Sequence, residues 1–154
     1  MKFRFYQLYY IAAAVLSVVA MCKDVLSATM PDGATYAVSN FAIAKPDGSV
    51  SCSVVALGVV LIAATLVNAF GLLVALFSNF ELQKRSSILS MLLFTGYYIL
   101  FVLFVLLLSP DILSLQTAAM LPLTALILDM MAFFSARRTE AKILAKASGF
   151  RLRD

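Results

Sequence analysis

The sequence predicts an all-α membrane protein: a bundle of four transmembrane helices, a small antiparallel β meander in the first extracytoplasmic loop, and a basic C-terminal cytoplasmic helix. The first observation is composition, because the chain is 63% hydrophobic and only 13% charged, whereas soluble domains are about half apolar and about a quarter charged. The second is a mean hydropathy of +0.99. The third is that charged residues lie in short stretches between long apolar segments. A chain of 154 residues has room for a single domain, residues 1–154.

The uncharged segments locate the membrane spans, because a helix needs about 20 apolar residues to cross about 30 Å of hydrocarbon. We predict spans at residues 5–22, 53–77, 87–108 and 115–135. The first span begins like a secretory leader, MKFR before an apolar run and a cysteine, but the run is longer than a usual signal core, so we expect it to be retained as a span. Pro122 is expected to bend the fourth span near its outer end.

Basic residues orient the spans. Ten of the twelve lie in three segments: the amino terminus, the loop between the second and third spans, and the tail at residues 136–154. The positive-inside rule assigns these segments to the cytoplasm. The sequence therefore predicts a multi-pass membrane protein, with both termini cytoplasmic and residues 23–52 outside.

The outer loop at residues 23–52 has the pattern of a small β structure. Pro-Asp-Gly occurs at residues 31–33 and again at 46–48. Each triplet suits a tight turn, since Pro presets φ, Asp bonds the nearby backbone, and Gly accepts a positive φ. We expect an antiparallel meander over the outer end of the bundle.

Between these turns, side chains alternate with a period of two, and the phase slips at residues 39–40, which predicts a bulge or a bend there. The loop has two interpretations, an ordered lid over the helix ends or a surface that binds a partner. The candidate partner-facing residues are Tyr36, Val38, Phe41 and Ile43.

Cys22 and Cys52 bracket the outer loop, and the sequence contains two cysteines in all. An oxidising outer compartment permits a disulfide between them, if their Cα atoms approach within about 7 Å. The alternative is two free, buried thiols that pack as small hydrophobic side chains. Neither cysteine belongs to a C-x-x-C pair, which argues against redox catalysis.

Asp129 and Asn68 form a candidate polar site inside the predicted spans. A carboxylate within a span costs on the order of 3 kcal/mol by insertion scales, and such residues often mark proton or ion pathways. The structural alternative is that Asp129 snorkels or pairs with a basic residue, since Arg137 follows two turns later. Asn68 lies in a row of small residues, Ala64, Gly71 and Ala75, and we expect it to hold helices together more readily than to contact a substrate.

The tail is predicted to continue as a basic helix. Arg138, Lys142 and Lys146 fall four residues apart and form a stripe that can bind an anionic inner leaflet. Gly149 is a suitable stop. Membrane lipid is therefore an expected partner, and nucleic acid is not, because topology already explains these basic residues.

The sequence has no histidine, so His-based metal sites and Ser-His triads are excluded, and it has no phosphate-binding P-loop motif. Acidic residues are scattered, without an evident general acid–base pair. We expect no enzyme activity, no catalytic residue, no metal and no cofactor.

The order of features resembles a family of small four-helix integral membrane proteins from Bacteroidota, the domain of unknown function 4293. The likeness covers nearly the whole chain: QLYYIAAAVL in the first span, TYAVSNFAI and PDG in the outer loop, LFSNFELQKRSSIL between spans two and three, LPLTALIL in the fourth, and RLR near the end. The more specific elements are the FxNxxLQ motif, made by Phe77, Asn79, Leu82 and Gln83, and the final Arg151-Leu152-Arg153. The resemblance implies the topology and the inner-membrane location, and it implies no activity.

The tail departs from the family pattern. It has Glu140 alone where family tails tend to carry an acidic pair, and Phe150 where they carry an aspartate before RLR. We therefore do not expect a salt-bridged tail geometry in this chain.

Three functions remain open. The first, which we favour, is a non-enzymatic accessory component that binds other membrane or periplasmic proteins, or lipid, through the outer loop and the basic tail. The second is a small transporter or ion pathway, built as a homo-oligomer, that uses Asp129 and Asn68. The third is a thiol-redox protein that uses Cys22 and Cys52.

Overall fold

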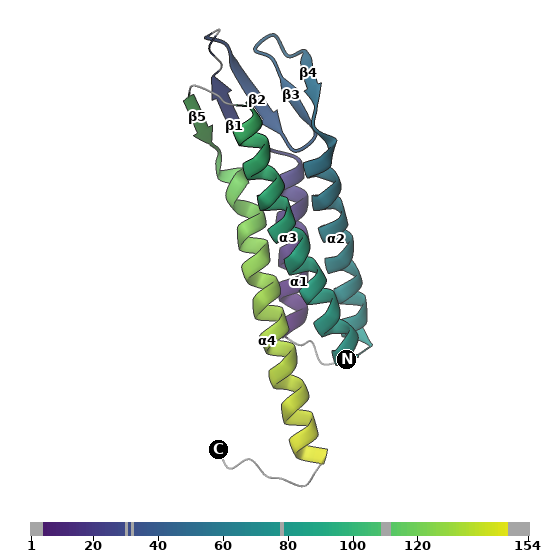
Figure 1. Ribbon diagram of the computed structural model, residues 1–154. Helices are drawn as coiled ribbons and strands as arrows, with labels where there is room; N and C mark the ends of the chain where they lie inside the picture. The colour runs from purple at the N-terminus through teal and green to yellow at the C-terminus, as the bar shows by residue number, and fades with distance from the viewer. Residues whose placement is uncertain (1–4, 30, 32, 78, 109–111, 148–154) are drawn as a thin grey trace.

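The computed structural model describes residues 5–29, 31, 33–77, 79–108 and 112–147. In this part of the chain, four α-helices lie side by side, and a small antiparallel sheet covers one end of them (Figure 1). The helices are α1 (Phe5–Met21), α2 (Val55–Leu76), α3 (Phe80–Leu108) and α4 (Leu121–Ala147). α1 and α3 each pack against both α2 and α4. Successive helices run in opposite directions (Figure 1).

Three of the described helices are long and apolar enough to cross a membrane, those within residues 55–76, 80–108 and 117–146. α1 is shorter, with 17 residues, but it is equally apolar. Every helix turns large apolar side chains outward, among them Val15 on α1, Leu66 and Phe70 on α2, Leu92 and Leu106 on α3, and Ile127 on α4. Exposed apolar belts of this kind are typical of lipid-facing helices.

The helix boundaries differ from the predicted spans at two places. α3 begins at Phe80, earlier than residue 87, because the helix continues beyond its apolar part into the charged segment that carries Lys84 and Arg85. α4 begins at Leu121, later than residue 115, because residues 112–115 form a strand and Thr117–Met120 form a 3-10 helix, η1. Pro122 is the second residue of α4, where its missing N–H costs nothing, and a bend at this end of the span stays a prediction.

The basic tail continues α4 as one helix that extends past the ends of the other helices (Figure 1). Arg138, Lys142 and Lys146 are exposed on this extension. The predicted stop at Gly149 and the RLR segment lie outside the described residues.

The sheet contains five strands in the order β4-β3-β2-β1-β5, all antiparallel. Its strands are β1 (Asp24–Thr29), β2 (Thr35–Ser39), β3 (Ala42–Ala44), β4 (Val50–Ser53) and β5 (Ile112–Leu115). Both Pro-Asp-Gly segments connect strands as predicted, with Gly33 at φ 76° and Gly48 at φ 81°. The Asp47 carboxylate accepts hydrogen bonds from the Ser49 hydroxyl and N–H, and these bonds lower the pKa of Asp47.

The phase slip at residues 39–40 is a complete chain reversal, sharper than the predicted bulge or bend within a strand. Val38 pairs with Ile43, and the chain turns between them. The Ser39 hydroxyl accepts the N–H of Ala42 at 3.1 Å and donates to the Ala42 carbonyl at 3.0 Å. The slip places Val38 and Ile43 on the same face of the sheet, where both are buried.

The strand β5 comes from the connection between α3 and α4 and pairs with β1 from Leu26↔Leu115 to Thr29↔Ile112. The sheet is therefore built from two segments far apart in the sequence, although the sequence pattern pointed to one. One apolar cluster joins the sheet to the helix ends, with Val25, Leu26, Val38 and Ile43 from the sheet and Leu57, Phe101 and Ala119 from the helical part. The sheet is thus part of the core that closes this end of the bundle.

Candidate functional site

The inward face of α3 divides the bundle interior into a polar half and an aromatic half. Residues at helical spacing along this face are all buried: Gln83, Ser86, Ser87, Ser90, Phe94, Tyr97 and Phe101. Spacings of three and four residues put them on one side of the helix. The polar half lies toward the turn between α2 and α3, and the aromatic half lies toward the sheet (Figure 1).

Asp129 enters this interior from α4. Its side chain is fully buried, and its Oδ2 accepts a hydrogen bond of 2.5 Å from the Ser90 hydroxyl, while its Oδ1 has no hydrogen-bond partner among the described residues. Its neighbours along the same face are small and fully buried: Ala125, Ala132 and Ala136. Small side chains allow α4 to approach the other helices closely, and the carboxyl lies where they meet.

The structure contradicts the expectation that Asp129 snorkels or pairs with a basic residue. Arg137 has its guanidinium carbon 5.7 Å from the centre of the Phe133 ring, and neither described salt bridge includes Asp129. Asp129 lies two turns before Arg137 on α4. It is on the face of α4 that points at α3, so its carboxyl stays inside the bundle.

Tyr10 of α1 completes the polar cluster. Its hydroxyl hydrogen-bonds with the Ser87 hydroxyl and donates to the carbonyl of Gln83 at 3.2 Å. The ring fits because Gly71 on α2 has no side chain: a Cβ there would lie 2.9 Å from Tyr10 Cε1 and 2.9 Å from Ser86 Oγ. Gly71 therefore lets three helices meet at one level.

Two side-chain amides in this interior are unpaired. Asn68 and Gln83 are fully buried, and neither the nitrogen nor the oxygen of either amide forms a hydrogen bond with the described residues. The Asn68 amide lies near the Asp129 carboxyl without bonding to it. Asn68 thus faces the polar cluster, and its amide forms no hydrogen bond with another helix among the described residues. Buried amides are normally bonded, which marks this cluster as unusual.

We refer to Tyr10, Asn68, Gln83, Ser87, Ser90 and Asp129 as the inner polar cluster. All four helices contribute to it. The sequence pattern singled out Asp129 and Asn68, and it missed Tyr10, Gln83, Ser87 and Ser90. The signal for the α3 members was present, since polar residues recur every three to four positions from Gln83 to Ser90 in an otherwise apolar helix.

A second buried polar contact lies at the sheet end. Asn40, in the turn between β2 and β3, donates from Nδ2 to the Ala20 carbonyl at 2.8 Å and accepts the Tyr97 hydroxyl at 2.8 Å. Asn40 is fully buried. This side chain joins the sheet to the end of α1 and to α3, and its role is structural because its amide is bonded at both atoms.

The predicted partner-facing residues point toward the helices and not outward. Val38 and Ile43 are buried among the helix ends, and Tyr36 is half-buried against the same cluster. The Phe41 ring packs directly on Gly58 of α2. Because of the slip in the alternation, the pair Tyr36 and Val38 and the pair Phe41 and Ile43 both lie on the side of the sheet that covers the helices. These four residues therefore do not form an outward surface.

The exposed apolar surface of the sheet lies on its two edge strands. Ile112, Leu113 and Leu115 of β5 are 63%, 38% and 54% exposed, and Val50 of β4 is 65% exposed. The strand order leaves one side of β4 and one side of β5 unpaired within the described sheet. Unpaired edges are the places at which another strand can add.

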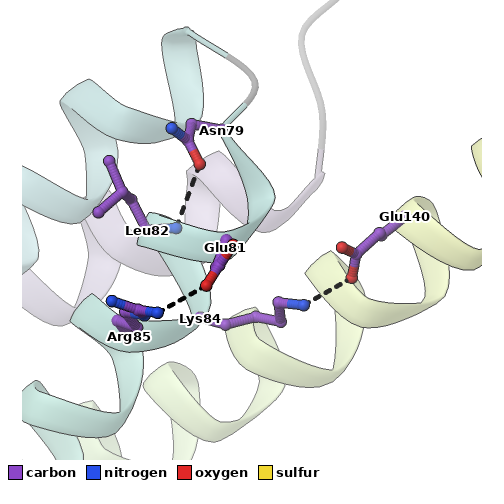
Figure 2. Close-up of polar contacts among 6 residues, drawn as sticks. All are labelled: Asn79, Glu81, Leu82, Lys84, Arg85 and Glu140. Carbon is purple, nitrogen blue, oxygen red and sulfur yellow. Dashed lines mark hydrogen bonds and ion pairs between the residues drawn. The ribbon is translucent and has the colours of Figure 1, made fainter.

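Polar and charged side chains contact one another at the end of the bundle away from the sheet (Figure 2). Asn79 Oδ1 accepts the N–H of Leu82 at 3.2 Å, as a side chain that caps a helix does. Lys84 of α3 and Glu140 of α4 form a salt bridge of 2.8 Å, and Glu81 and Arg85 form one of 2.6 Å within α3. Glu140, the acidic residue of the predicted tail, is therefore bonded to Lys84 of α3.

The cysteines are not brought together in the described part of the chain. Cys22 is a free, exposed thiol, so it is not the buried residue that the alternative required. The side chain of Cys52 lies outside the described residues. β2 and β3 separate β4, which contains Cys52, from β1, which follows Cys22. A disulfide between them stays a prediction.

An open groove of about 330 Å³ lies between α2 and α3 on the lipid-facing side. Its lining is mainly apolar: Leu66, Val67, Phe70, Leu82, Arg85, Ser86 and Leu89. Among the described residues, no three His, Cys, Asp or Glu side chains gather in a way that could hold a metal ion.

The chain matches a known protein family. The model of a domain of unknown function, DUF4293, matches residues 4–143, which is most of the chain: α1, α2, α3, the sheet, and α4 as far as residue 143. No curated protein matches the sequence significantly. The chain therefore belongs to the DUF4293 family.

Proposed function

We propose that this protein crosses the bacterial inner membrane four times, with both termini in the cytoplasm, and acts there as a non-enzymatic accessory component. The observation that carries the membrane proposal is the large number of exposed apolar side chains on all four helices. The inner-membrane location follows from the Bacteroidota origin that the resemblance implied.

α1 supports the fourth span. It is 17 residues long, about 26 Å at 1.5 Å per residue, close to the thickness of the hydrocarbon core. It packs along α2 and α4, so it lies at the same depth as they do. Its outward residues Leu8, Val15 and Val18 are 47%, 56% and 47% exposed. Such a surface suits lipid and not water.

The orientation rests on the basic residues. The segments at Lys84 and Arg85, and at Arg137 to Lys146, all belong to the end of the bundle away from the sheet (Figure 1). The positive-inside rule makes this end cytoplasmic and the sheet extracytoplasmic. Exposed basic residues on the extension of α4 are available to anionic lipid headgroups.

The partner-binding role rests on the edges of the sheet. β5 presents apolar side chains beside an unpaired strand edge, and this combination favours an extended segment of another extracytoplasmic protein that adds as a sixth strand. We expect no catalysis, because the sequence has no histidine and the described acidic residues do not form a paired general acid and base.

The experiment is gentle extraction of the tagged protein and comparison of what copurifies. Ile112→Lys with Leu115→Lys changes only exposed β5 side chains, so the fold is expected to remain. The matched control is Leu144→Lys, which is 63% exposed on the extension of α4. A stoichiometric protein that is lost from the β5 variant and kept by the control supports the proposal. If the wild type is extracted without a partner, the docking role fails.

A second candidate function is an ion pathway through a small oligomer, favoured by the buried carboxyl of Asp129 inside the inner polar cluster. It predicts that Asp129→Asn abolishes a flux in reconstituted vesicles while the protein remains folded. The thiol-redox function has less support, because Cys22 is a free thiol without a described partner.

A further inference from the structure

The inner polar cluster surrounds Asp129 with uncharged groups. Ser90 donates to Oδ2 from α3, Asn68 lies nearby on α2, and Oδ1 has no partner among the described residues. From α1, the Tyr10 hydroxyl hydrogen-bonds with the Ser87 hydroxyl, one turn of α3 from Ser90. All of these side chains are at most 1% exposed. The carboxyl is therefore hydrogen-bonded at Oδ2 and has no described hydrogen bond at Oδ1.

These neighbours can bond both forms of a carboxyl group. A serine hydroxyl and an asparagine amide can each donate to a carboxylate or accept from a carboxylic acid. A fixed positive charge would favour the carboxylate alone. The sequences of α1 and α2 contain no charged residue, and the nearest charges on α3 are already paired, Lys84 with Glu140 and Arg85 with Glu81. The site therefore suits a group that gains and loses a proton.

Polar groups continue from Asp129 toward one end of the bundle. Ser87 lies one turn from Ser90 along α3, and Gln83 lies one turn further. The Tyr10 hydroxyl contacts both of them, and the Gln83 amide is fully buried with both of its atoms unpaired. Unpaired buried amides are groups that bond internal water. Together these side chains form a polar path that leads to the end that carries Asn79 and Lys84.

On its sheet side, Asp129 adjoins an apolar layer from α2, α3 and α4. The buried hydroxyl of Ser17 on α1 is bonded to the Ala13 carbonyl, and Tyr97 and Asn40 lie beyond this layer. One turn toward the sheet, the inward residues are Phe94 on α3, Ala64 on α2 and Ala125 on α4. All three are 0% exposed and belong to the apolar cluster that continues into the sheet. A hydrocarbon layer of this kind offers a proton no hydrogen-bonding groups. The polar path therefore ends at Asp129.

We propose that Asp129 is a reversible proton-binding site that exchanges with the aqueous phase only at the end of the bundle that carries the turn between α2 and α3. The site binds a proton from one side and does not conduct it to the other. This inference goes beyond the partner-binding role. It rests on the proposed topology only for which compartment lies at that end of the bundle, namely the cytoplasm.

The test is infrared difference spectroscopy of the purified protein in vesicles of neutral phospholipid, with protons as the probe. A step from alkaline to acidic buffer is expected to produce a carboxylic-acid carbonyl band that disappears on return. Asp129→Asn is expected to lose this band completely, and Asp129→Glu to keep it at a shifted frequency. Glu140→Gln, which removes the half-buried carboxyl of the salt bridge with Lys84, is expected to leave the band unchanged. A wild-type spectrum without a band that depends on Asp129 overturns the proposal.

Sidedness is read from sealed vesicles sorted by orientation. Single cysteines at Ser49 and Lys142, in a background without Cys22 and Cys52, report which end faces outward through their reaction with an impermeant thiol reagent. A step in external pH is expected to change the Asp129 band only when Lys142→Cys is the labelled position. An equal response in the opposite orientation overturns one-sided access.

Two further variants separate a path from a purely structural cluster. Ser87→Ala is expected to slow the response severalfold, and Tyr97→Phe, on the apolar side, is expected to leave its rate unchanged. Equal rates in all variants contradict the path. The labelled cysteines also test the topology, so a wrong orientation for the proposed function is distinguished from failure of the proton site.

Discussion

The Ser90 hydroxyl on α3 donates a hydrogen bond of 2.5 Å to Oδ2 of Asp129 on α4, and both side chains are fully buried. This contact joins two helices inside the bundle and supplies the only described hydrogen bond to the carboxyl. A carboxyl that is bonded to a hydroxyl can exist with or without its proton, whereas a salt bridge would hold it ionised. The pair therefore links the packing of the bundle to its most distinctive chemical group.

Ser90→Ala is expected to lower the free energy of unfolding by about 1–3 kcal/mol, because it leaves a buried carboxyl without a partner. The measurement is reversible unfolding in detergent. Thr95→Ala is the control, since the Thr95 hydroxyl is exposed and bonds only its own helix, at the Met91 carbonyl. The control is expected to change stability by less than about 0.5 kcal/mol. Equal effects of the two substitutions would contradict the contact.

Gly71→Ala is expected to destabilise the protein by about 1–3 kcal/mol, because the added methyl meets Tyr10 and Ser86 at 2.9 Å and displaces them. Gly96→Ala is the matched control on α3, where a Cβ has no atom within 4 Å. The control is expected to be neutral or to stabilise by up to about 1 kcal/mol, the helix preference of alanine over glycine. Thermal unfolding of both variants separates crowding from helix propensity. The same sign for both would show that α1, α2 and α3 do not meet at Gly71.

Tyr97→Phe is expected to cost about 1–3 kcal/mol, because it removes the donor to Asn40 Oδ1 and leaves a buried oxygen unpaired. Hydrogen exchange in β2 and β3 is expected to increase more than exchange in the middle of the helices. Tyr98→Phe is the comparison, since the Tyr98 hydroxyl donates to the Ala119 carbonyl from a half-buried position, and a smaller effect is expected. Unchanged exchange in the sheet would refute the role of Asn40 as its connection to α3.

The Lys84–Glu140 salt bridge predicts a measurable coupling between α3 and α4. Its side chains are 27% and 29% exposed, so a double-mutant cycle with Lys84→Met and Glu140→Gln is expected to give up to about 1 kcal/mol, lowered by salt. The control cycle is Glu81 with Arg85, whose side chains are 69% and 73% exposed, and it is expected to give about 0.5 kcal/mol or less. If this coupling free energy is no larger than that of the control cycle, the salt bridge of Glu140 does not stabilise the extension of α4.

The sequence by itself determined the class of protein and the approximate positions of its helices, because a long apolar segment without charges satisfies its backbone in lipid only as a helix. It also determined both Pro-Asp-Gly turns, since a positive φ at Gly33 and Gly48 is a local requirement. The polar residues Asp129 and Asn68 were identifiable, because each stands alone in an apolar segment.

The tertiary structure alone decided what those residues contact. The pairing of β5 with β1 joins residues about 85 positions apart in the chain, and an exposed four-residue strand has too weak a pattern to predict this. The burial of Val38 and Ile43, and the packing of the Phe41 ring on Gly58, followed from a chain reversal at Asn40 that changed which face each residue occupies. Asp129 lies beside Ser90 and not beside Arg137 because helix rotation and packing against three neighbours set its direction. Such contacts between distant segments depend on the fit of the whole bundle, which local patterns do not contain.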